Sequence, residues 1–523
     1  MSVEPSSSQD GDLTRLPEEV LFNIFERLGS WELFCLARIS ERIQKVSLSI
    51  YYDRRGIDLS TTGIIDITRE KDYDLLALLR ITTFFTRTGH ISVVFVFPKW
   101  DFMENIRNLT LILRRLVSLD MITLEFRFDP DKRVAEENRT KLLAAEARTS
   151  TYKGLSKELR RLFCTAFRVA GVVRILESEQ LFKMVGGDPN NYFLALPSTP
   201  VISKYKLAAK VRMNKIAKLA SRKQKEKEPE AHHESSVVSL DIRSLVPLVP
   251  PLLSSTVMCL NVQSKLRHLS FTTTSDDQVS WGPLLSNLHI PSLVQLTMSS
   301  NSCTLTDLAK FVKRHLQMSI LDIRDLAPLP TELPKAATCA FRHLISVIAP
   351  SEVLGAFLPP DITPRLEEAH LAITITEDRQ FDFAQAWSSL AHVEERLQNL
   401  RSFGLVVAYE AGESPFGKTT EDEEREKLVP LVKVLTLRLK DDLEADTFGP
   451  LTDWIMEFTN TRELQLQSLY PYPYPIQTFS TESMVEAEEE RKRKREVFCE
   501  ELSSKLVAME SLETCDIFGR RYP

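Results

Sequence analysis

Residues Leu266–Ile323 read "LRHLSFTTTSDDQVSWGPLLSNLHIPSLVQLTMSSNSCTLTDLAKFVKRHLQMSILDI". Three strings in this stretch have an apolar residue at positions one, four and six: "LRHLSF" from Leu266, "LVQLTM" from Leu293 and "MSILDI" from Met318. Positions four and six of each string predict one buried face of a strand. A helix is predicted before the third string by the spacing of Leu308, Phe311, Val312 and Leu316. The stretch therefore predicts strands that alternate with helices.

More divergent copies of the pattern follow towards the C-terminus. They are "LEEAHLAI" from Leu366, "LRSFGL" from Leu400, "VKVLTL" from Val432, "TRELQL" from Thr461 and "LETCDI" from Leu512. Helical spacing precedes two of these strings, at Trp387, Leu390 and Leu397 and at Leu451, Trp454, Ile455 and Phe458. A charged segment from Glu486 predicts one further helix, docked through Phe498, Leu502 and Leu506.

The first three strings start 27 and 25 residues apart, within the leucine-rich-repeat period of about 20 to 29 residues. The unit at Leu293 extends to Asn301 as L-x-x-L-x-M-x-x-N, which resembles a leucine-rich repeat. The other units lack this Asn and their spacing is irregular. We expect an α/β fold, an irregular leucine-rich-repeat-like solenoid of parallel strands with helices outside and a concave side free to bind. The alternative is a single irregular α/β domain with ordinary buried strands.

The N-terminal segment Leu16–Ser40 reads "LPEEVLFNIFERLGSWELFCLARIS". Its caps predict a helix from Pro17 to Leu28 with Thr14 as N-cap, a second helix after Ser30 and a third after Ser40. Apolar residues form adjacent rows on the first helix, at Val20, Ile24 and Leu28 and at Leu21 and Phe25. Because so short a unit cannot cover this stripe alone, either the rest of the chain or a partner must pack on it.

These residues resemble the F-box. The matching positions are Leu16-Pro17-Glu18-Glu19-Val20, Ile24-Phe25, Leu28, Glu32-Leu33, Leu36-Ala37-Arg38, Ser40, Arg42 and Ile43. One departure is Ile43, where many F-boxes carry Trp. The resemblance implies a three-helix module that docks on the Skp-type adaptor of cullin-based ubiquitin ligases. The implied adaptor contacts are Leu16, Pro17, Val20, Leu21, Ile24, Phe25, Leu28, Leu33, Leu36 and Ile43.

A basic run separates the two halves of the chain. Its cationic residues are Lys204, Lys206, Lys210, Arg212, Lys215, Lys218, Arg222, Lys223, Lys225 and Lys227. The composition favours a solvated linker and leaves open a nuclear-localisation signal or a phosphate-binding patch. Because Tyr205 is the one aromatic residue interleaved with these charges, base stacking is disfavoured and nucleic acid is not the expected partner.

These features predict a division of the chain into six segments. They are a disordered tail at 1–12, an F-box at 13–55, the start of the repeat-like solenoid at 56–131, a helical elaboration at 132–203, a basic linker at 204–236 and the leucine-rich-repeat-like solenoid at 237–523. Helix is favoured most strongly from Lys132 to Leu176, where Leu155, Leu159, Leu162, Phe163 and Phe167 share one face.

Composition excludes several classes of protein. The net charge of -6 argues against a chain that coats nucleic acid or an anionic membrane. The seven cysteines are scattered without a CxxC pair and are expected to be reduced, and no signal peptide, lipidation box or membrane span is found. We therefore expect a cytoplasmic or nuclear protein.

Motifs that carry catalysis are also missing. The sequence contains no GxGxxG, GxxxxGK[ST], HExxH or GxSxG, and His232 and His233 are adjacent and cannot form an i,i+4 metal pair. We expect no catalytic residues, cofactor or metal. With the F-box resemblance, this favours a non-catalytic substrate receptor that holds an unknown protein target while its F-box recruits the adaptor and, through it, a cullin. The alternatives are an interaction scaffold without ubiquitin-ligase output and a nuclear regulator that binds nucleic acid through the basic run.

Overall fold

A computed structural model of the chain describes most of the sequence. The described residues are 16–57, 60, 63–67, 73–97, 102–128, 150–177, 237–248, 252–272, 279, 281–299, 303–325, 341–375, 383–409, 423–439, 448–468, 482–518 and 520–522. The chain divides into two compact units, of which the first comprises 1–187, 232–240 and 246–259 and the second 188–231, 241–245 and 260–523.

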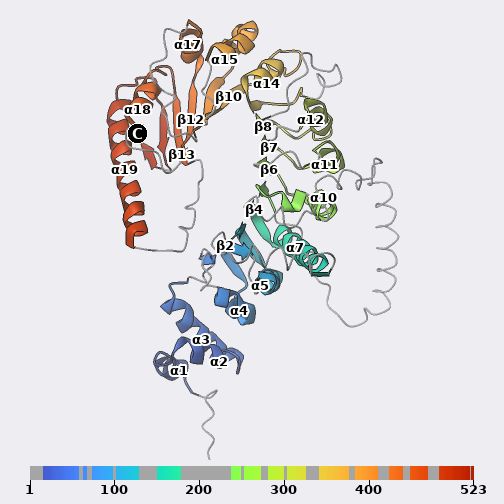
Figure 1. Cartoon of the computed structure of the whole chain (residues 1–523), viewed down its shortest axis with the longest axis vertical. Helices are drawn as coiled ribbons and strands as arrows, with labels where there is room; N and C mark the ends of the chain where they lie inside the picture. The colour runs from blue at the N-terminus through green and yellow to red at the C-terminus, as the bar shows by residue number, and fades with distance from the viewer. Residues whose placement is uncertain are drawn as a thin grey trace, which may run out of the picture. The chain divides into compact units, whose positions relative to one another are not determined.

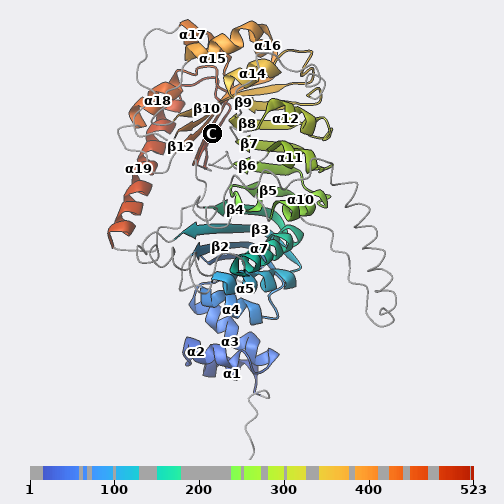
Figure 2. The ribbon, with the colours of Figure 1, turned by 45° about the vertical axis from the view of Figure 1, so that its right-hand side comes forward.

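Three helices begin the first unit, and strands alternating with helices follow them (Figure 1). Its elements are α1 (Glu18–Phe25), α2 (Ser30–Leu36), α3 (Glu41–Arg54), β1 (Ile64–Ile67), α4 (Tyr73–Ile81), β2 (Arg87–Phe97), α5 (Phe102–Arg115), β3 (Ser118–Phe128), α7 (Ser150–Val169) and β4 (Ala170–Glu177). Strands β1 to β4 pair in parallel and in chain order. Figure 2 shows α4, α5 and α7 beside these strands.

Strand β5 (Ser239–Ile242) is divided between the two units, and η4 (Val246–Leu248) and α10 (Leu253–Asn261) up to Cys259 belong to the first. The second unit continues the alternation. It contains β6 (His268–Thr272), α11 (Trp281–Asn287), β7 (Gln295–Ser299), α12 (Leu305–Val312), β8 (Ile320–Asp325), β9 (Ser346–Ala349), α14 (Ser351–Phe357), β10 (Glu368–Ile375), α15 (Phe383–Leu390), η6 (Ala391–Val393), α16 (Glu394–Asn399), β11 (Ser402–Tyr409), α17 (Glu423–Leu428), η7 (Val429–Leu431), β12 (Val434–Leu439), α18 (Phe448–Met456), β13 (Glu463–Ser468), α19 (Glu482–Leu506), β14 (Thr514–Ile517) and β15 (Arg520–Tyr522).

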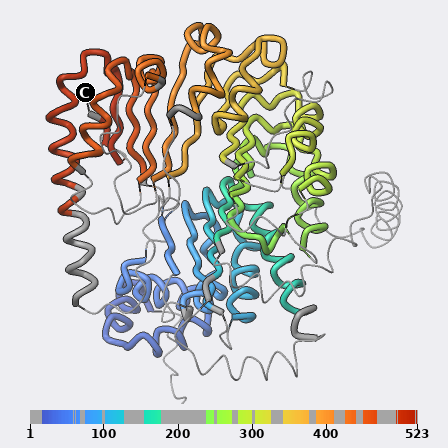
Figure 3. The backbone as a smooth tube through the Cα atoms, turned by 45° about the horizontal axis from the view of Figure 1, so that its top comes forward, coloured from blue at the N-terminus to red at the C-terminus, as the bar shows by residue number. Residues whose placement is uncertain are grey.

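Strands β6 to β14 of the second unit pair in parallel and in chain order, and β15 pairs antiparallel with β14. Figure 3 traces these strands as neighbouring runs that follow one another from green to red. Register aligns apolar residues in rows under the helices, and one such row is Leu269, Leu296, Leu321, Val347, Ala369 and Phe403. All six side chains are buried, so this row forms part of the hydrophobic core.

Aromatic side chains from the strands and from α7 fill part of the core of the first unit. Phe95 of β2 and Phe126 of β3 stack with ring centroids 5.4 Å apart, and Phe163 of α7 meets Phe126 edge-on at 6.1 Å. Such aromatic pairs add to the stabilisation that burial of apolar area already provides. The predicted face of α7 is confirmed at Leu159, Leu162, Phe163 and Phe167, which are buried, whereas Leu155 is half-buried.

The structure confirms the predicted α/β fold class, with three N-terminal helices followed by a solenoid-like alternation of parallel strands and helices. Every repeated string quoted above forms a strand, and the helical spacings form α12, α15 with α16, α18 and α19. The prediction at the third string is confirmed at Leu308, Phe311 and Val312, whereas Leu316 lies beyond the end of α12 and is exposed.

Some predicted boundaries are wrong. Helix α7 ends at Val169, and the following residues to Glu177 form β4, because Val172, Val173 and Ile175 are β-branched and suit a strand. The N-cap of the first helix is Pro17, and this helix ends at Phe25 rather than at Leu28. The N-cap of α2 is Gly29 rather than Ser30. Ser40 caps α3 as expected and accepts a hydrogen bond from the backbone N–H of Ile43.

Several predictions lie outside the described residues. They concern the tail at 1–12, Thr14, the helix-favouring residues 132–149, the segment 178–203, the basic run with its linker at 204–236 and Asn301.

A buried histidine ties two repeats of the second unit together. His315 follows α12 and is 1% exposed. Its Nδ1–H donates to the carbonyl of Phe311 at 2.7 Å, and its Nε2 accepts from the backbone N–H of Ile290 at 3.0 Å. Both ring nitrogens are thus used by the neutral imidazole. Burial lowers the pKa of His315 to about 4.

Because the pKa of His315 is lowered in the folded chain, we expect the free energy of unfolding to fall in mild acid. The unfolded chain binds a proton near the ordinary pKa of about 6.5, whereas folded His315 binds one only near 4, so its stabilisation is present above pH 6.5 and is lost as pH falls towards 4. We expect a loss of at most about 3 kcal/mol from this group. Urea unfolding at pH 7.5, 6 and 5 measures it, and His315→Asn should show a shallower pH dependence. An equal pH dependence in this variant would contradict the assignment.

A glycine permits close packing on the face of the sheet opposite to the buried row that contains Phe403. Gly404 of β11 lies opposite His370 of β10 and Val434 of β12 in the register. A Cβ atom at Gly404 would collide with the imidazole Nδ1 of His370 and lie 2.7 Å from the carbonyl oxygen of Val434. Because the second neighbour is backbone, the clash cannot be relieved by a rotamer change alone.

Gly404→Ala should therefore lower the free energy of unfolding by about 1 to 3 kcal/mol, the usual range for overpacking. Gly449→Ala on α18 is the matched control, because nothing lies within 4 Å of the added methyl group. This control should be neutral or slightly stabilising, since Ala favours helix over Gly. Equal urea midpoints for the two variants would show that the space at Gly404 is not needed.

Candidate functional site

Helices α1 and α2 both pack on α3. Arg54 on α3 donates to the carbonyl of Leu28 at 2.6 Å and to that of Glu26, just beyond the end of α1. Arg42, near the start of α3, donates to the carbonyl of Leu16. These arginines satisfy carbonyls at both ends of α1 and fix its position on α3.

The interior of this three-helix module uses four residues that the sequence assigned to the adaptor contact. Leu21, Phe25, Leu33 and Ile43 are at most 1% exposed in this chain. Their side chains therefore hold the three helices together. Leu16, Leu28 and Leu36 are half-buried, and Pro17 is exposed.

The other side of α3 is covered by the rest of the first unit. The side-chain amide of Gln44 donates to the carbonyls of Ala37 and Ile81, and its oxygen accepts from the backbone N–H and the hydroxyl of Thr83. Gln44 is 8% exposed and all its hydrogen-bonding capacity is used. The hydroxyl of Tyr52 lies 2.7 Å from that of Thr82, which follows α4. The module is thus anchored on its own chain through α3.

Large apolar side chains remain exposed on α1, on α2 and just after α2. Val20 and Ile24 are each 41% exposed, one helical turn apart on α1. Three others are exposed that the sequence did not assign to a contact, namely Phe22, Trp31 and Ile39. Trp31 is 70% exposed, and its ring lies 5.6 Å from that of Phe34. Trp31 could have been assigned to a contact from the sequence, because it is an aromatic residue in the first turn of α2. We call these five exposed residues, Val20, Phe22, Ile24, Trp31 and Ile39, the apolar patch; on α1, Phe22 lies about half a helical turn from Val20 and Ile24.

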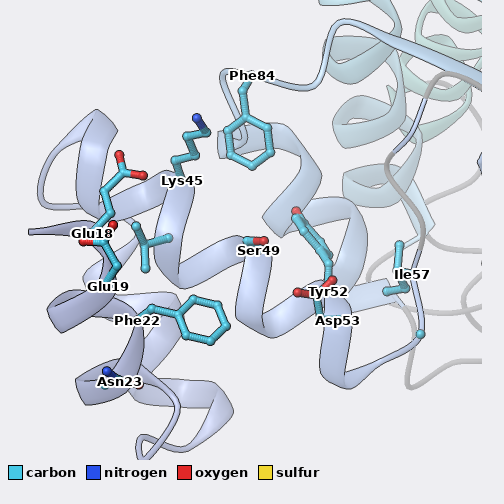
Figure 4. A pocket seen from close by; sticks show the side chains of 12 residues that line it. Glu18, Glu19, Phe22, Asn23, Lys45, Ser49, Tyr52, Asp53, Ile57 and Phe84 are labelled. Atoms are coloured by element: carbon cyan, nitrogen blue, oxygen red, sulfur yellow. The ribbon is translucent and has the colours of Figure 1, made fainter.

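A pocket of about 860 Å³ lies on the Phe22 side of α1, between α1, α3 and the loop that follows α4 (Figure 4). Phe22, Tyr52 and Phe84 give it aromatic walls, and Val46 and Ile57 also line it. Its charged residues are Glu18, Glu19, Asp53 and Lys45. The pocket therefore combines an apolar lining with a net negative rim.

The second unit carries a polar face on the side of its sheet that turns away from the helices. Asp322 of β8 is buried, and its carboxylate pairs with Arg324 at 3.1 Å. Burial lowers the pKa of Arg438 on β12 to about 10, and the charge of Arg324 contributes to this shift. We call Asp322, Arg324, His370, Arg438 and Glu463 the polar sheet face.

His370 lies at the centre of this face. Burial lowers its pKa, and the carboxylates of Glu368, Glu463 and Asp322 oppose the shift. Its buried Nδ1 has no hydrogen-bond partner among the described residues. The face thus presents both signs of charge, together with a neutral imidazole.

The residues that the structure describes include no group of three or more His, Cys, Asp or Glu side chains arranged to hold a metal ion. None of the helices in the described ranges has both the length and the apolar character needed to cross a membrane.

Comparison with known proteins assigns the N-terminal module. Residues 13–54 match the family model of the F-box domain, which covers α1, α2 and α3. No curated protein matches the chain. The leucine-rich-repeat-like interpretation of the remaining residues rests on their strand and helix order alone. An F-box domain indicates, at a general level, that the protein binds a Skp-type adaptor. The chain therefore carries an F-box domain at residues 13–54.

Proposed function

We propose that this protein is a non-catalytic substrate receptor of a Skp-cullin-F-box ubiquitin ligase. The F-box docks on the Skp-type adaptor, and the repeat-like region binds the protein that receives ubiquitin. The apolar patch is the observation that carries the proposal, because it remains exposed on a domain whose other side is anchored on its own chain.

The patch has the composition of a protein interface. Val20 and Ile24 present aliphatic side chains one turn apart, and Trp31 presents a large aromatic surface. Interfaces derive most of their affinity from a few such residues, which are desolvated on binding. Buried Leu21, Phe25, Leu33 and Ile43 support this surface from beneath, so they act on adaptor binding through the shape of the module.

The pocket lined by Phe22 offers a second apolar contact on α1. Its aromatic lining suits an apolar side chain of the adaptor, and Glu18, Glu19 and Asp53 suit a basic neighbour of that side chain.

The polar sheet face of the second unit is the proposed site for the target. Its charges and the imidazole of His370 offer directional contacts, which favour a target with complementary polar groups. The receptor then contributes no catalytic group. It brings the target close to a ubiquitin carrier held by the cullin and thereby raises their effective concentration.

Replacing Ile24 by Asp should weaken adaptor binding at least tenfold, because a carboxylate would be buried in an apolar contact. Leu111→Asp is the matched control, since Leu111 on α5 is also 41% exposed, in the same unit and away from the patch. Calorimetric titration of the full chain with purified adaptor measures both variants, and circular dichroism checks that each is folded. Adaptor binding that survives Ile24→Asp would contradict the proposed contact.

The ubiquitin-ligase role is tested separately from adaptor binding. Full chain captured together with adaptor and cullin should promote ubiquitin transfer to a co-purified protein, and Ile24→Asp should abolish that transfer while target binding persists. An interaction scaffold would bind the adaptor without such transfer. A nucleic-acid regulator would instead bind nucleic acid with a steep salt dependence that disappears when residues 204–227 are deleted.

A further inference from the structure

Two cysteines that are far apart in the sequence meet in the first unit. Cys164 lies on α7 and Cys259 on the last turn of α10. Their sulfur atoms are 2.6 Å apart, although 95 positions separate the residues. Neither belongs to a CxxC motif, so their proximity arises from the fold.

The pair also has the surroundings of a reactive dithiol. Both side chains are partly exposed, so a small molecule can reach them. Contact with Cys259 lowers the pKa of the Cys164 thiol; burial opposes that shift and the guanidinium of Arg160, one helical turn earlier, adds to it. The same contact and burial raise the pKa of Cys259. Cys164 is therefore the better nucleophile and Cys259 the proton donor.

The other described cysteines differ from this pair. Cys303, Cys499 and Cys515 are buried, and burial with the charge of Asp516 raises the pKa of Cys515 to about 11. Cys35 is exposed on α2. Its exposure makes Cys35 a useful comparison for reactivity.

We propose that Cys164 and Cys259 form a peroxide-responsive dithiol that closes to an intramolecular disulfide. The Cys164 thiolate attacks the O–O bond of hydrogen peroxide, forms a sulfenic acid and releases hydroxide, which leaves as water after it takes up a proton. The Cys259 thiol then attacks the Cys164 sulfur. Hydroxide leaves with the Cys259 proton as a second water, and the S–S bond forms. Two thiols are oxidised by two electrons while one peroxide is reduced to two waters.

Closure has a structural consequence. The bond ties α7 to the last turn of α10 and closes a loop from residue 164 to residue 259, with the basic run at 204–227 inside it. A cross-link over so long a loop restricts the unfolded chain and stabilises the folded one. Oxidation should therefore raise the thermal midpoint by several degrees, and dithiothreitol should reverse the rise.

Peptide mapping of the full chain tests the bond directly. After a brief hydrogen peroxide pulse and alkylation, trypsin should release Leu162–Arg168 disulfide-linked to Ser244–Lys265. This linked species should disappear on reduction. Separate, fully alkylated peptides after the pulse would overturn the proposal.

Single variants assign the two roles. Cys259→Ser should leave a sulfenic acid on Cys164 that dimedone traps, whereas Cys164→Ser should give much less trapping at Cys259. Cys35→Ser is the matched control and should leave the amount of linked peptide unchanged. Equal trapping at both positions would refute the assignment of Cys164 as nucleophile. Formation of the disulfide itself is tested by the linked peptide in the wild-type protein, which needs no variant.

Discussion

Parallel pairing is the constraint on which this structure depends. Two parallel neighbours cannot be joined by a tight turn, so the chain between them must cross back along the sheet, usually as a helix. Each crossover helix then covers the buried row of its own strand. Leu296 and Leu321 therefore have to be apolar at matching register positions, and Leu308 of α12, the helix between their strands in the chain, is buried as well. The repeated strings express this requirement, and the sheet in each unit follows from satisfying it strand after strand.

The F-box is joined to the rest of the first unit by a different kind of contact. Gln44 satisfies carbonyls on both sides of the junction, and Tyr52 meets Thr82 beyond α4. A buried amide with all its partners in place specifies one arrangement, because any shift leaves a polar group unsatisfied at a cost of about 1 to 3 kcal/mol. Helix α3 thus packs against α1 and α2 and also against the residues that end and follow α4. This explains why the exposed apolar side chains occur on α1, on α2 and beyond α2.

The sequence was informative where one periodicity was clear and uninformative where two were possible. Strings such as "LVQLTM" located strands because alternation fits only one face of a sheet. On α1, however, the row of Val20 and Ile24 and the row of Leu21 and Phe25 are equally apolar. Only α3, which is distant in sequence, decides that the second row is buried. Strand β9 was missed because its string, "LISVIA" from Leu344, has the small residue Ala349 at position six, which weakens the pattern.

The two candidate surfaces differ in physical character in a way that suits the proposed roles. Apolar burial is non-directional and tolerates small misfits, which suits a partner that is shared by many receptors. A polar face with Asp322, Arg324 and His370 discriminates more strongly, because a ligand that leaves one of these groups unpaired pays the desolvation cost without compensation. In the proposed function, the apolar patch of the F-box recruits the shared adaptor and the polar sheet face selects the target.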